Sequence, residues 1–475
     1  MVKRWRSFGA LLALAAILSG CGGGGGGSAS GPIAGGPSPA PSPSGACSLS
    51  ARQNWAFGVL NEWYLFPETL PASLDPTPYA TVGDYIDALT ATARGQGRDR
   101  FFTYLTSIKE EDAFYNAGAS AGFGFRLSTD AAQQRAFVAE SFEGAPAFAA
   151  GMDRGDEIVA IGETGNLRLV SDIIAASGTG GVSDALGPAT AGVTRTLRLS
   201  GPAGTREITI TKADYSLQPV SSRYGAKIID EGGRRIGYLN LRTFITTADS
   251  QLKTAFGQFQ AAGVTDVIVD LRYNGGGLVD SAQLLGDLLG RARFPTEVQN
   301  RTVFRPEKAS RNETRFFRAQ GQSVAAMRIA FIGTGATASA SELAINSQLP
   351  YFQQNMALVG ANTYGKPVGQ IAIDRSQCDD RLRVIAFATK NANGGGDYYT
   401  GLAGTIPVTC QAGDDLSHPL GDPQEASVRQ ALDFIAGKVC TPIPTGQTSQ
   451  RLAARRELLR PARPSAAQRE VPGLF

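Results

Sequence analysis

The sequence predicts a multi-domain α/β protein with a helical N-terminal domain, a β-domain and an α/β core whose sheet is mainly parallel. Apolar residues recur at helical spacing in 47–117, short strand-length runs dominate 118–213, and strands alternate with helices in 214–440. A chain of 475 residues is long enough for two or three such domains.

The first 21 residues have the pattern of an export signal. A basic start at 3–6 precedes an apolar run at 8–18, which is too short to span a bilayer permanently. The run ends in the letters LSGC, with Cys21 last. This ending resembles the bacterial lipobox, and the resemblance implies a lipoprotein signal peptide at 1–21 with a lipid on Cys21. An ordinary secretory signal with an incidental cysteine is the alternative.

Residues 22–46 are rich in Gly, Pro and Ser, a composition typical of a flexible tether. Gly22 stands where lipoproteins kept at the inner membrane of Gram-negative bacteria carry Asp. By that resemblance we expect a lipid-anchored protein of the cell envelope that faces the periplasm, at the outer membrane in a Gram-negative cell.

The remaining cysteines are even in number, as expected in an oxidising compartment. They are Cys47, Cys378, Cys410 and Cys440. Three pairings are possible, of which we favour Cys378–Cys410, within one region, together with Cys47–Cys440, which would tie the ends of the folded part. A zinc site of four thiolates is the alternative, but no CxxC spacing supports it.

Charge and histidine content exclude several function classes. The net charge is +3, and six Arg against two Glu in the last 35 residues account for that excess. We therefore expect no nucleic-acid partner. The single histidine, His418, lies in a turn-rich stretch, so a Ser-His pair would have to use a poorly placed base and a multi-His metal site is excluded. We expect neither a metal nor a cofactor.

Two helices are expected in the N-terminal domain, at 51–64 and 82–93. The next domain opens with a glycine-rich loop and continues with the run GAPA at 144–147 and a turn at 150–156. In this order the two blocks resemble a PDZ domain of the bacterial protease type. The resemblance implies that the loop binds a peptide carboxylate and that the following strand accepts the peptide by β-augmentation. The loop residues are Gly122, Phe123, Gly124 and Phe125.

Strands and helices alternate through the core. The expected strands are 235–241, 264–271, 329–332 and 357–360, and the expected helices are 248–262, 280–289 and 342–349. The nearly continuous apolar character of 264–271 favours a strand buried on both faces, so we expect a mainly parallel sheet with crossover helices.

A run of small residues at 333–340 follows one core strand, and Ser341 then stands where a helix begins. Free N–H groups there favour an oxyanion, although an N-cap serine is the commoner meaning of such a residue and Ser339 could compete. With His418 poorly placed, the candidate base is Lys366, 25 residues later, beside the same sheet edge. A solvated or ion-paired lysine is the alternative.

Ser341, Lys366 and the earlier run DLRYNGGGL at 270–278 resemble the motifs of the C-terminal processing peptidases, tail-specific proteases related to the tricorn core. The resemblance implies that Ser341 is the nucleophile, that Lys366 is the general base and that Gln370 orients the lysine. It also implies an oxyanion hole made by the backbone N–H groups of Gly276 and Glu342.

Two positions depart from the family pattern. Gly275 replaces the usual proline of the earlier motif, and Pro367 replaces the glycine that usually follows the lysine. Because Pro367 lacks an N–H and has a fixed φ, the loop can differ locally, but neither change removes a reacting group.

The same resemblance implies a serine endopeptidase that cleaves exposed C-terminal or unfolded segments of exported proteins, with the PDZ domain recognising or gating the substrate C-terminus. Its partners would be protein or peptide substrates, and the membrane through Cys21. The alternative is a non-catalytic periplasmic peptide-binding or scaffold protein on the same fold.

The tail at 441–475 is rich in Pro, Ala and Arg and is expected to be disordered. It ends in the letters VPGLF, an apolar carboxyl terminus of the kind that a PDZ groove accepts. Self-inhibition or trimming of this end is one hypothesis. The alternative is an unstructured basic extension near anionic membrane surfaces.

Overall fold

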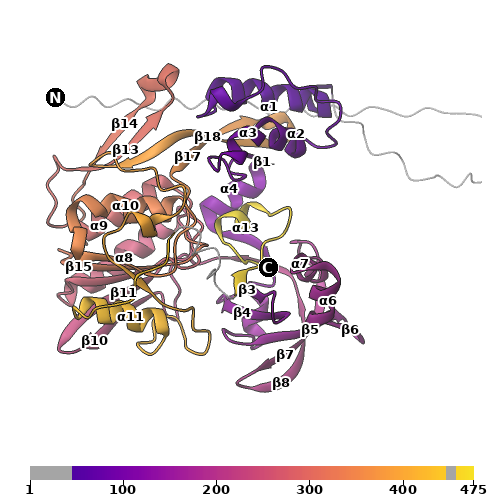
Figure 1. The fold of residues 1–475 in the computed structure, drawn as a ribbon. Coiled ribbons are helices and arrows are strands. Elements are labelled where there is room, and N and C mark those ends of the chain that lie inside the picture. The colour runs from indigo at the N-terminus through magenta and orange to yellow at the C-terminus, as the bar shows by residue number, and fades with distance from the viewer. Residues whose placement is uncertain (1–44, 446–455) are drawn as a thin grey trace, which may run out of the picture. The chain divides into compact units, whose positions relative to one another are not determined.

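The structure is a computed structural model that describes residues 45–445 and 456–475, and residues 45–475 form one compact unit (Figure 1). The expected signal peptide, Cys21 and nearly all of the expected tether lie outside the described residues. Within the described ranges, no helix has the length and apolar character needed to cross a membrane.

A six-stranded sheet forms the centre of the α/β core, in the order β10-β11-β12-β15-β16-β19. β10 is antiparallel to β11 and every other neighbouring pair is parallel. The strands are β10 (Ala226–Glu231), β11 (Arg234–Asn240), β12 (Asp266–Asp270), β15 (Arg328–Gly333), β16 (Met356–Gly360) and β19 (Thr409–Gln411). The mainly parallel sheet predicted from the alternating pattern is therefore present.

Helices cover both faces of this sheet, which explains the continuous apolar character of its strands. Alternate residues such as Val267 and Val269 pack in one core with three helices, while Ile268 packs on the opposite face with the fourth. The three helices are α8 (Ala248–Ala261), α9 (Val279–Leu289) and α10 (Ala340–Phe352), and the fourth is α11 (Ala426–Ile435).

The β-domain is a seven-stranded antiparallel sheet in the order β20-β3-β4-β5-β7-β8, with β6 also paired to β5. Its strands are β3 (Phe125–Asp130), β4 (Arg135–Ser141), β5 (Glu157–Glu163), β6 (Asn166–Leu169), β7 (Thr194–Gly201), β8 (Gly204–Thr211) and β20 (Glu457–Leu458). A core shared with α6 (Val170–Ser177) and α7 (Gly180–Leu186) lies against the sheet. At the base of the domain, β2 (Ala119–Gly122) pairs with β9 (Ala213–Ser216), where the chain enters and leaves.

The N-terminal helices form where they were expected, but they do not bury a core of their own. α1 (Leu49–Trp63) and α2 (Val82–Leu89) pack on β17 (Val368–Arg375) and β18 (Asp380–Asn391), and β1 (Tyr104–Ser107) extends the same sheet. The expectation of a separate domain at 47–117 is therefore wrong in this respect, because the apolar faces of two short helices are covered by strands from the core. The other helices of this region are α3 (Ala91–Gly95) and α4 (Ile108–Ala117). The sheet is completed by β13 (Val298–Phe304) and β14 (Glu313–Phe316), in the order β1-β18-β13-β14.

The four predicted cysteines form two disulfides, but the favoured pairing is wrong. The bonds are Cys47–Cys378 and Cys410–Cys440. The start of α1 lies against the β17–β18 hairpin, where Arg52 pairs with Asp380 at 2.5 Å, so Cys47 meets the hairpin turn. α11 returns the chain to β19, which brings the second pair together.

The expectation of a disordered tail at 441–475 is wrong for residues 456–475. They form β20 and α13 (Ala466–Glu470), and the final five residues are buried. Apolar residues of this segment enter the cores of the β-domain and of its junction with the α/β core, which stabilises a segment too polar to fold alone.

Buried charges join the β-domain to the core. Glu140 on β4 accepts hydrogen bonds from Arg126 on β3, from Arg242 after β11 and from the hydroxyl of Tyr224. Glu140 and both arginines are at most 2% exposed. Burial alone would raise the pKa of Glu140, but the arginines outweigh it and lower this pKa to about 2.

We predict that Glu140→Gln destabilises the protein by about 3–5 kcal/mol, because two buried arginines lose their counter-charge. Urea denaturation at pH 7 measures this change. A carboxylate with a lowered folded pKa stabilises above its unfolded value of 4.5 and loses that contribution as the pH falls toward about 2. Wild-type stability should therefore fall more steeply than that of the variant over this range, and parallel pH profiles would contradict the prediction.

Candidate active site

Ser341 lies in the first turn of α10, directly after the tight turn that follows β15. Ser339 in this turn has a φ of +56°, a left-handed conformation that is uncommon for a residue with a side chain. Ser341 is fully buried, and its hydroxyl donates to the backbone carbonyl of Asn274 at 3.0 Å. The helix start predicted for Ser341 is confirmed.

The loop after β12 lies against this serine. Gly276 and Gly277 have φ values of +122° and +126°, and a side chain on Gly276 would come within 2.9 Å of the Cβ atom of Ser339. Glycine is therefore required for the loop to approach the serine turn. The N–H of Gly276, expected to line the oxyanion hole, donates here to the side-chain oxygen of Asn274 at 2.9 Å.

The carboxylate of Glu342 holds the serine helix and the lysine loop together. Its oxygens accept from the N–H groups of Gly365 and Lys366, both at 2.7 Å, and from the hydroxyl of Thr363 at 2.6 Å. It also accepts from the N–H of Ser339 at 3.0 Å. Glu342 is fully buried, and its burial raises its pKa although these hydrogen bonds oppose the rise. We call these five residues the Glu342 clamp.

The clamp fixes the backbone of Lys366 next to the serine helix, and the amine continues toward β17. There its Nζ donates to Oε1 of Gln370 at 3.0 Å and lies 5.1 Å from the ring centre of Phe102. Gln370 in turn donates to the carbonyl of Phe102. The contact between Lys366 and Gln370 predicted from the family pattern is present.

Burial lowers the pKa of Lys366 below its ordinary value of 10.5, while the carboxylates of Glu470 and Asp99 act against this shift. A lowered pKa increases the fraction of neutral amine at a given pH, which is the form that a general base requires. Among the described residues, no hydrogen bond joins Lys366 to Ser341: the serine donates to Asn274 and the lysine to Gln370.

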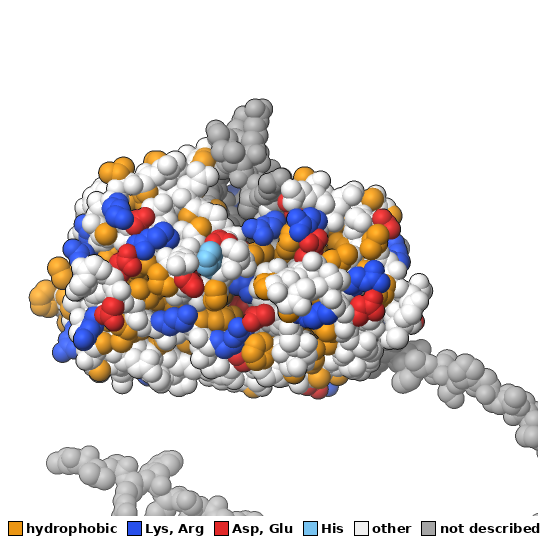
Figure 2. Space-filling view, turned by 90° about the horizontal axis from the view of Figure 1, so that it is seen from below, with side chains coloured by type: hydrophobic (Ala, Val, Ile, Leu, Met, Phe, Trp, Pro, Cys, Tyr) orange, Lys and Arg blue, Asp and Glu red, His pale blue; other side chains and the backbone are white. Residues whose placement is uncertain are grey.

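His418 lies away from this constellation, in a surface turn. Its Nδ1 is 2.6 Å from the carboxylate of Asp415, which raises the pKa of the imidazole, and its side chain is 34% exposed. Figure 2 shows the histidine on the surface, among acidic and basic side chains that are interspersed. The prediction of a surface turn is confirmed.

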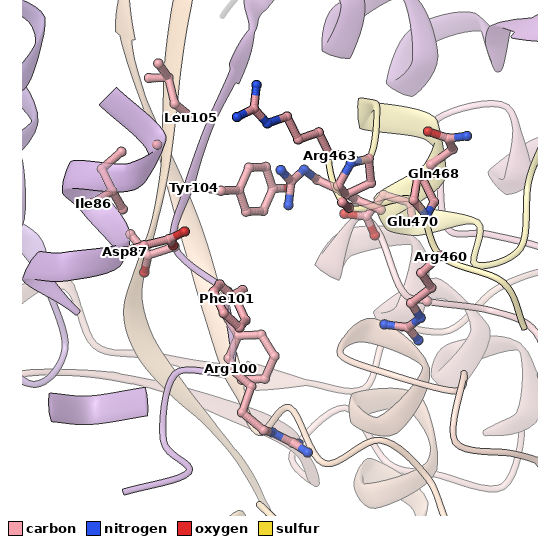
Figure 3. A pocket seen from close by; sticks show the side chains of 18 of the residues that line it. Ile86, Asp87, Arg100, Phe101, Tyr104, Leu105, Arg460, Arg463, Gln468 and Glu470 are labelled. Carbon is pink, nitrogen blue, oxygen red and sulfur yellow. The ribbon is translucent and has the colours of Figure 1, made fainter. Parts of the chain in front are cut away.

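A cavity of about 670 Å³ opens beside the lysine (Figure 3). Lys366, Gly275 and Ala338 lie in its wall. Figure 3 shows Asp87, Arg100 and Tyr104 on one side and Arg460 and Glu470, from the C-terminal segment, on the other. Among the described residues, no group of three or more His, Cys, Asp or Glu could hold a metal ion.

Residues 235–403 match the model of peptidase family S41. This part of the chain is similar to the core of S41 peptidases. The match covers the loop with Gly276, the serine helix, Lys366 and Gln370, so every residue of the predicted catalytic set lies within it.

Curated relatives are consistent with this similarity. The chain is 26% identical over 261 residues to a carboxyl-terminal-processing protease of Synechocystis sp., covering 54% of this chain and 56% of the relative. It is also 26% identical over 273 residues to the chloroplastic C-terminal processing peptidase of Tetradesmus obliquus, covering 55% and 54%. The chain thus spans about half the length of these curated relatives.

A solved structure from Bacteroides fragilis NCTC 9343, described as an S41 protease, shares the fold. The TM-score is 0.63 at 24% identity, over 81% of this chain and 97% of that one.

Sequence reasoning missed the carboxylate of Glu342, for which it predicted only a backbone role. A signal was available, because Ser339 and Glu342 have the spacing of a helix capping box. It also missed Asn274 as the partner of Ser341 and Glu470 as a charge beside Lys366. No local pattern marks these two, since each meets its partner through the tertiary fold.

We predict that Glu342→Gln lowers stability by about 1–3 kcal/mol and reduces peptidase activity. An amide replaces one accepting oxygen with a donor, which leaves buried N–H groups of the clamp unpaired. Thermal unfolding and kcat/KM test this prediction. Glu307→Gln, at a side chain that is 64% exposed, is the matched control, and equal behaviour of the two variants would show that the clamp is dispensable.

Proposed function

We propose that this protein is a serine endopeptidase that cleaves exposed C-terminal or unfolded segments of exported proteins by a Ser-Lys mechanism. The observation that carries the proposal is the Glu342 clamp, which fixes a lysine of lowered pKa beside the helix that begins at the buried Ser341. The S41 match over the same residues supports it.

In the proposed reaction, neutral Lys366 accepts the hydroxyl proton of Ser341 while Oγ attacks the scissile carbonyl carbon. The C–N bond of the tetrahedral intermediate then breaks, and the lysine ammonium returns the proton to the leaving amine. Water attacks the acyl-enzyme by the same route, which releases the carboxylic acid and restores the serine. Gln370 orients the amine through its hydrogen bond.

The oxyanion would be stabilised by the backbone N–H groups of Gly276 and Glu342, at the start of α10. For this to happen, the N–H of Gly276 must leave Asn274, and the hydroxyl of Ser341 must turn from the carbonyl of Asn274 to the lysine. The described conformation therefore corresponds to a resting state, and substrate binding must rearrange the Asn274 loop.

The β-domain, with its PDZ-like loop at 122–125, would recognise the substrate C-terminus. The site of action would be the cell envelope, with the chain held by lipid at Cys21 and facing the periplasm. Radiolabelled fatty acid incorporated by the wild type but not by Cys21→Ala would test the anchor.

We predict that Ser341→Ala lowers the cleavage rate of an unstructured reporter peptide with an apolar C-terminus by about 10⁴-fold or more, since the nucleophile is lost. Ser339→Ala is the matched control, two residues earlier in the same turn. Cleavage that survives in Ser341→Ala but is lost in Ser339→Ala would reassign the nucleophile, and equal cleavage by wild type and Ser341→Ala would refute the serine mechanism.

We predict that kcat/KM rises with pH, with a midpoint below 10.5, because only the neutral amine of Lys366 accepts a proton and its pKa is lowered. Lys366→Ala should lose about 10²–10⁴-fold in rate together with this alkaline limb. A pH–rate profile of both proteins measures the effect. A variant with an unchanged profile would show that another group is the base.

A further inference from the structure

The carboxyl terminus of the chain lies in the carboxylate-binding loop that the sequence predicts. One carboxylate oxygen of Phe475 accepts from the N–H groups of Gly124 at 2.8 Å and Phe125 at 3.3 Å. A side chain on Gly122 would lie 3.0 Å from the terminal carbon, so glycine is needed there for the terminus to fit. Successive backbone N–H groups around a carboxylate form an anion site.

The last residues also pair with the free edge of the β-domain sheet. Phe475 donates to the carbonyl of Phe125 at 2.9 Å, and Gly473 accepts from the N–H of Leu127 at 2.8 Å, in an antiparallel arrangement. Farther along β3, β20 pairs with Ser128 and Thr129. The tail thus occupies the edge at which a peptide ligand would add a strand.

Buried side chains hold the tail in this position. Phe475 is 4% exposed and packs in the β-domain core, while Val471 and Leu474 pack with Phe114 and Phe142 where that domain meets its neighbours. Figure 1 shows α13 and the C-terminus next to β3. These contacts make the segment an integral part of the fold.

Between its two paired ends the tail crosses the candidate active site. The carbonyl of Glu470 accepts from the N–H of Gly275 at 3.1 Å, and a side chain on Gly275 would be only 2.9 Å from that carbonyl. Pro472 accepts from Arg126, whose same nitrogen also binds the carbonyl of Tyr273. The tail therefore binds the loop that must move before an oxyanion hole can form.

We call the loop 122–125 and the adjoining edge of β3 the β-domain groove. We infer that the chain's own C-terminal segment, 456–475, is the resident ligand of this groove and holds the peptidase in a latent state. This inference rests on the proposed function. Release of the segment would free both the groove for a substrate C-terminus and the Asn274 loop for rearrangement.

Charge acts in the same direction. Glu470 lies in the cavity wall with Lys366, and its carboxylate raises the pKa of the lysine against the effect of burial. Burial in turn raises the pKa of Glu470, while Lys366 and the Tyr115 hydroxyl oppose that rise. An anion at this place favours the protonated amine, which cannot act as a base.

Tethering makes the tail a strong competitor. A ligand on a short linker has an effective concentration of roughly 1 mM, so a tail with an intrinsic dissociation constant of about 10 μM would weaken the binding of any free peptide at the same place about 100-fold. Latency that can be relieved by a substrate of high local concentration follows from this competition.

The test compares the full chain with a truncation that lacks residues 471–475 and with a variant extended by Gly-Ser-Gly-Ser after Phe475. The extension removes the terminal carboxylate from its site but keeps every buried side chain, so it serves if the truncation folds poorly. The probe is a fluorescein-labelled peptide of the sequence AAQREVPGLF, identical to residues 466–475. The affinity of the probe is measured by fluorescence anisotropy, and the cleavage rate is measured with the reporter peptide.

We expect both variants to bind the probe about 10–100-fold more tightly than the full chain and to cleave the reporter faster. Glu307→Gln is the control, because its exposed side chain lies outside the tail, β3 and the candidate active site, and it should behave like wild type. Unchanged probe affinity and unchanged cleavage in both variants would overturn the inference.

The two readouts separate this inference from the proposed function. If both variants bind the probe more tightly than the full chain but none of the proteins cleaves the reporter, the tail would stand as the resident ligand and the proposed peptidase activity would be rejected. If the full chain and both variants cleave the reporter at the same rate and bind the probe with the same affinity, the proposed peptidase activity would stand and the latent state would be rejected. If inhibition of the full chain weakens when the protein is diluted, the tail that fills the groove comes from a second copy of the chain. That result would overturn the inference that each tail binds its own groove.

Discussion

The Glu342 clamp is the interaction on which the arrangement of the active site depends. One buried carboxylate accepts four hydrogen bonds, three of them from the backbone, from two loops at the edge of the central sheet. Since a buried carboxylate is costly unless it is fully paired, these loops have little freedom to separate. This constraint keeps the backbone of Lys366 next to the helix that begins at Ser341, while the two side chains can still change partners.

The parts of the site differ in how firmly they are held. The lysine is fixed through its backbone and through Gln370, and the serine by the start of α10. The Asn274 loop is different, because its carbonyl and side chain occupy the hydroxyl of Ser341 and the N–H of Gly276. In the proposed mechanism, activation would exchange hydrogen bonds in this one loop, and the tail contacts that loop directly through Gly275.

The core was predictable because its information is local. Strand-length apolar runs alternate with helical ones, and the small residues before Ser341 mark a turn into a helix. Glu342 carried a local signal that pointed to the helix cap but not to the lysine loop. The disulfides could not be paired, because the partner of Cys47 depends on how α1 packs against a hairpin more than 300 residues later. The polar composition of the tail likewise concealed its order, since the strand that receives it lies about 330 residues earlier.

The Cys47–Cys378 bond has a mechanical consequence. It joins the residues before α1 covalently to the turn of the β17–β18 hairpin, and β17 carries Gln370. A pulling force applied at the amino-terminal end of the folded unit would pass through this bond into the sheet, and α1 would not be peeled from the surface first. The same bond brings that load to Cys378, eight residues from Gln370, whose side chain binds the amine of Lys366. Reduction of the disulfide would therefore change how the protein bears tension, even where its equilibrium fold is retained.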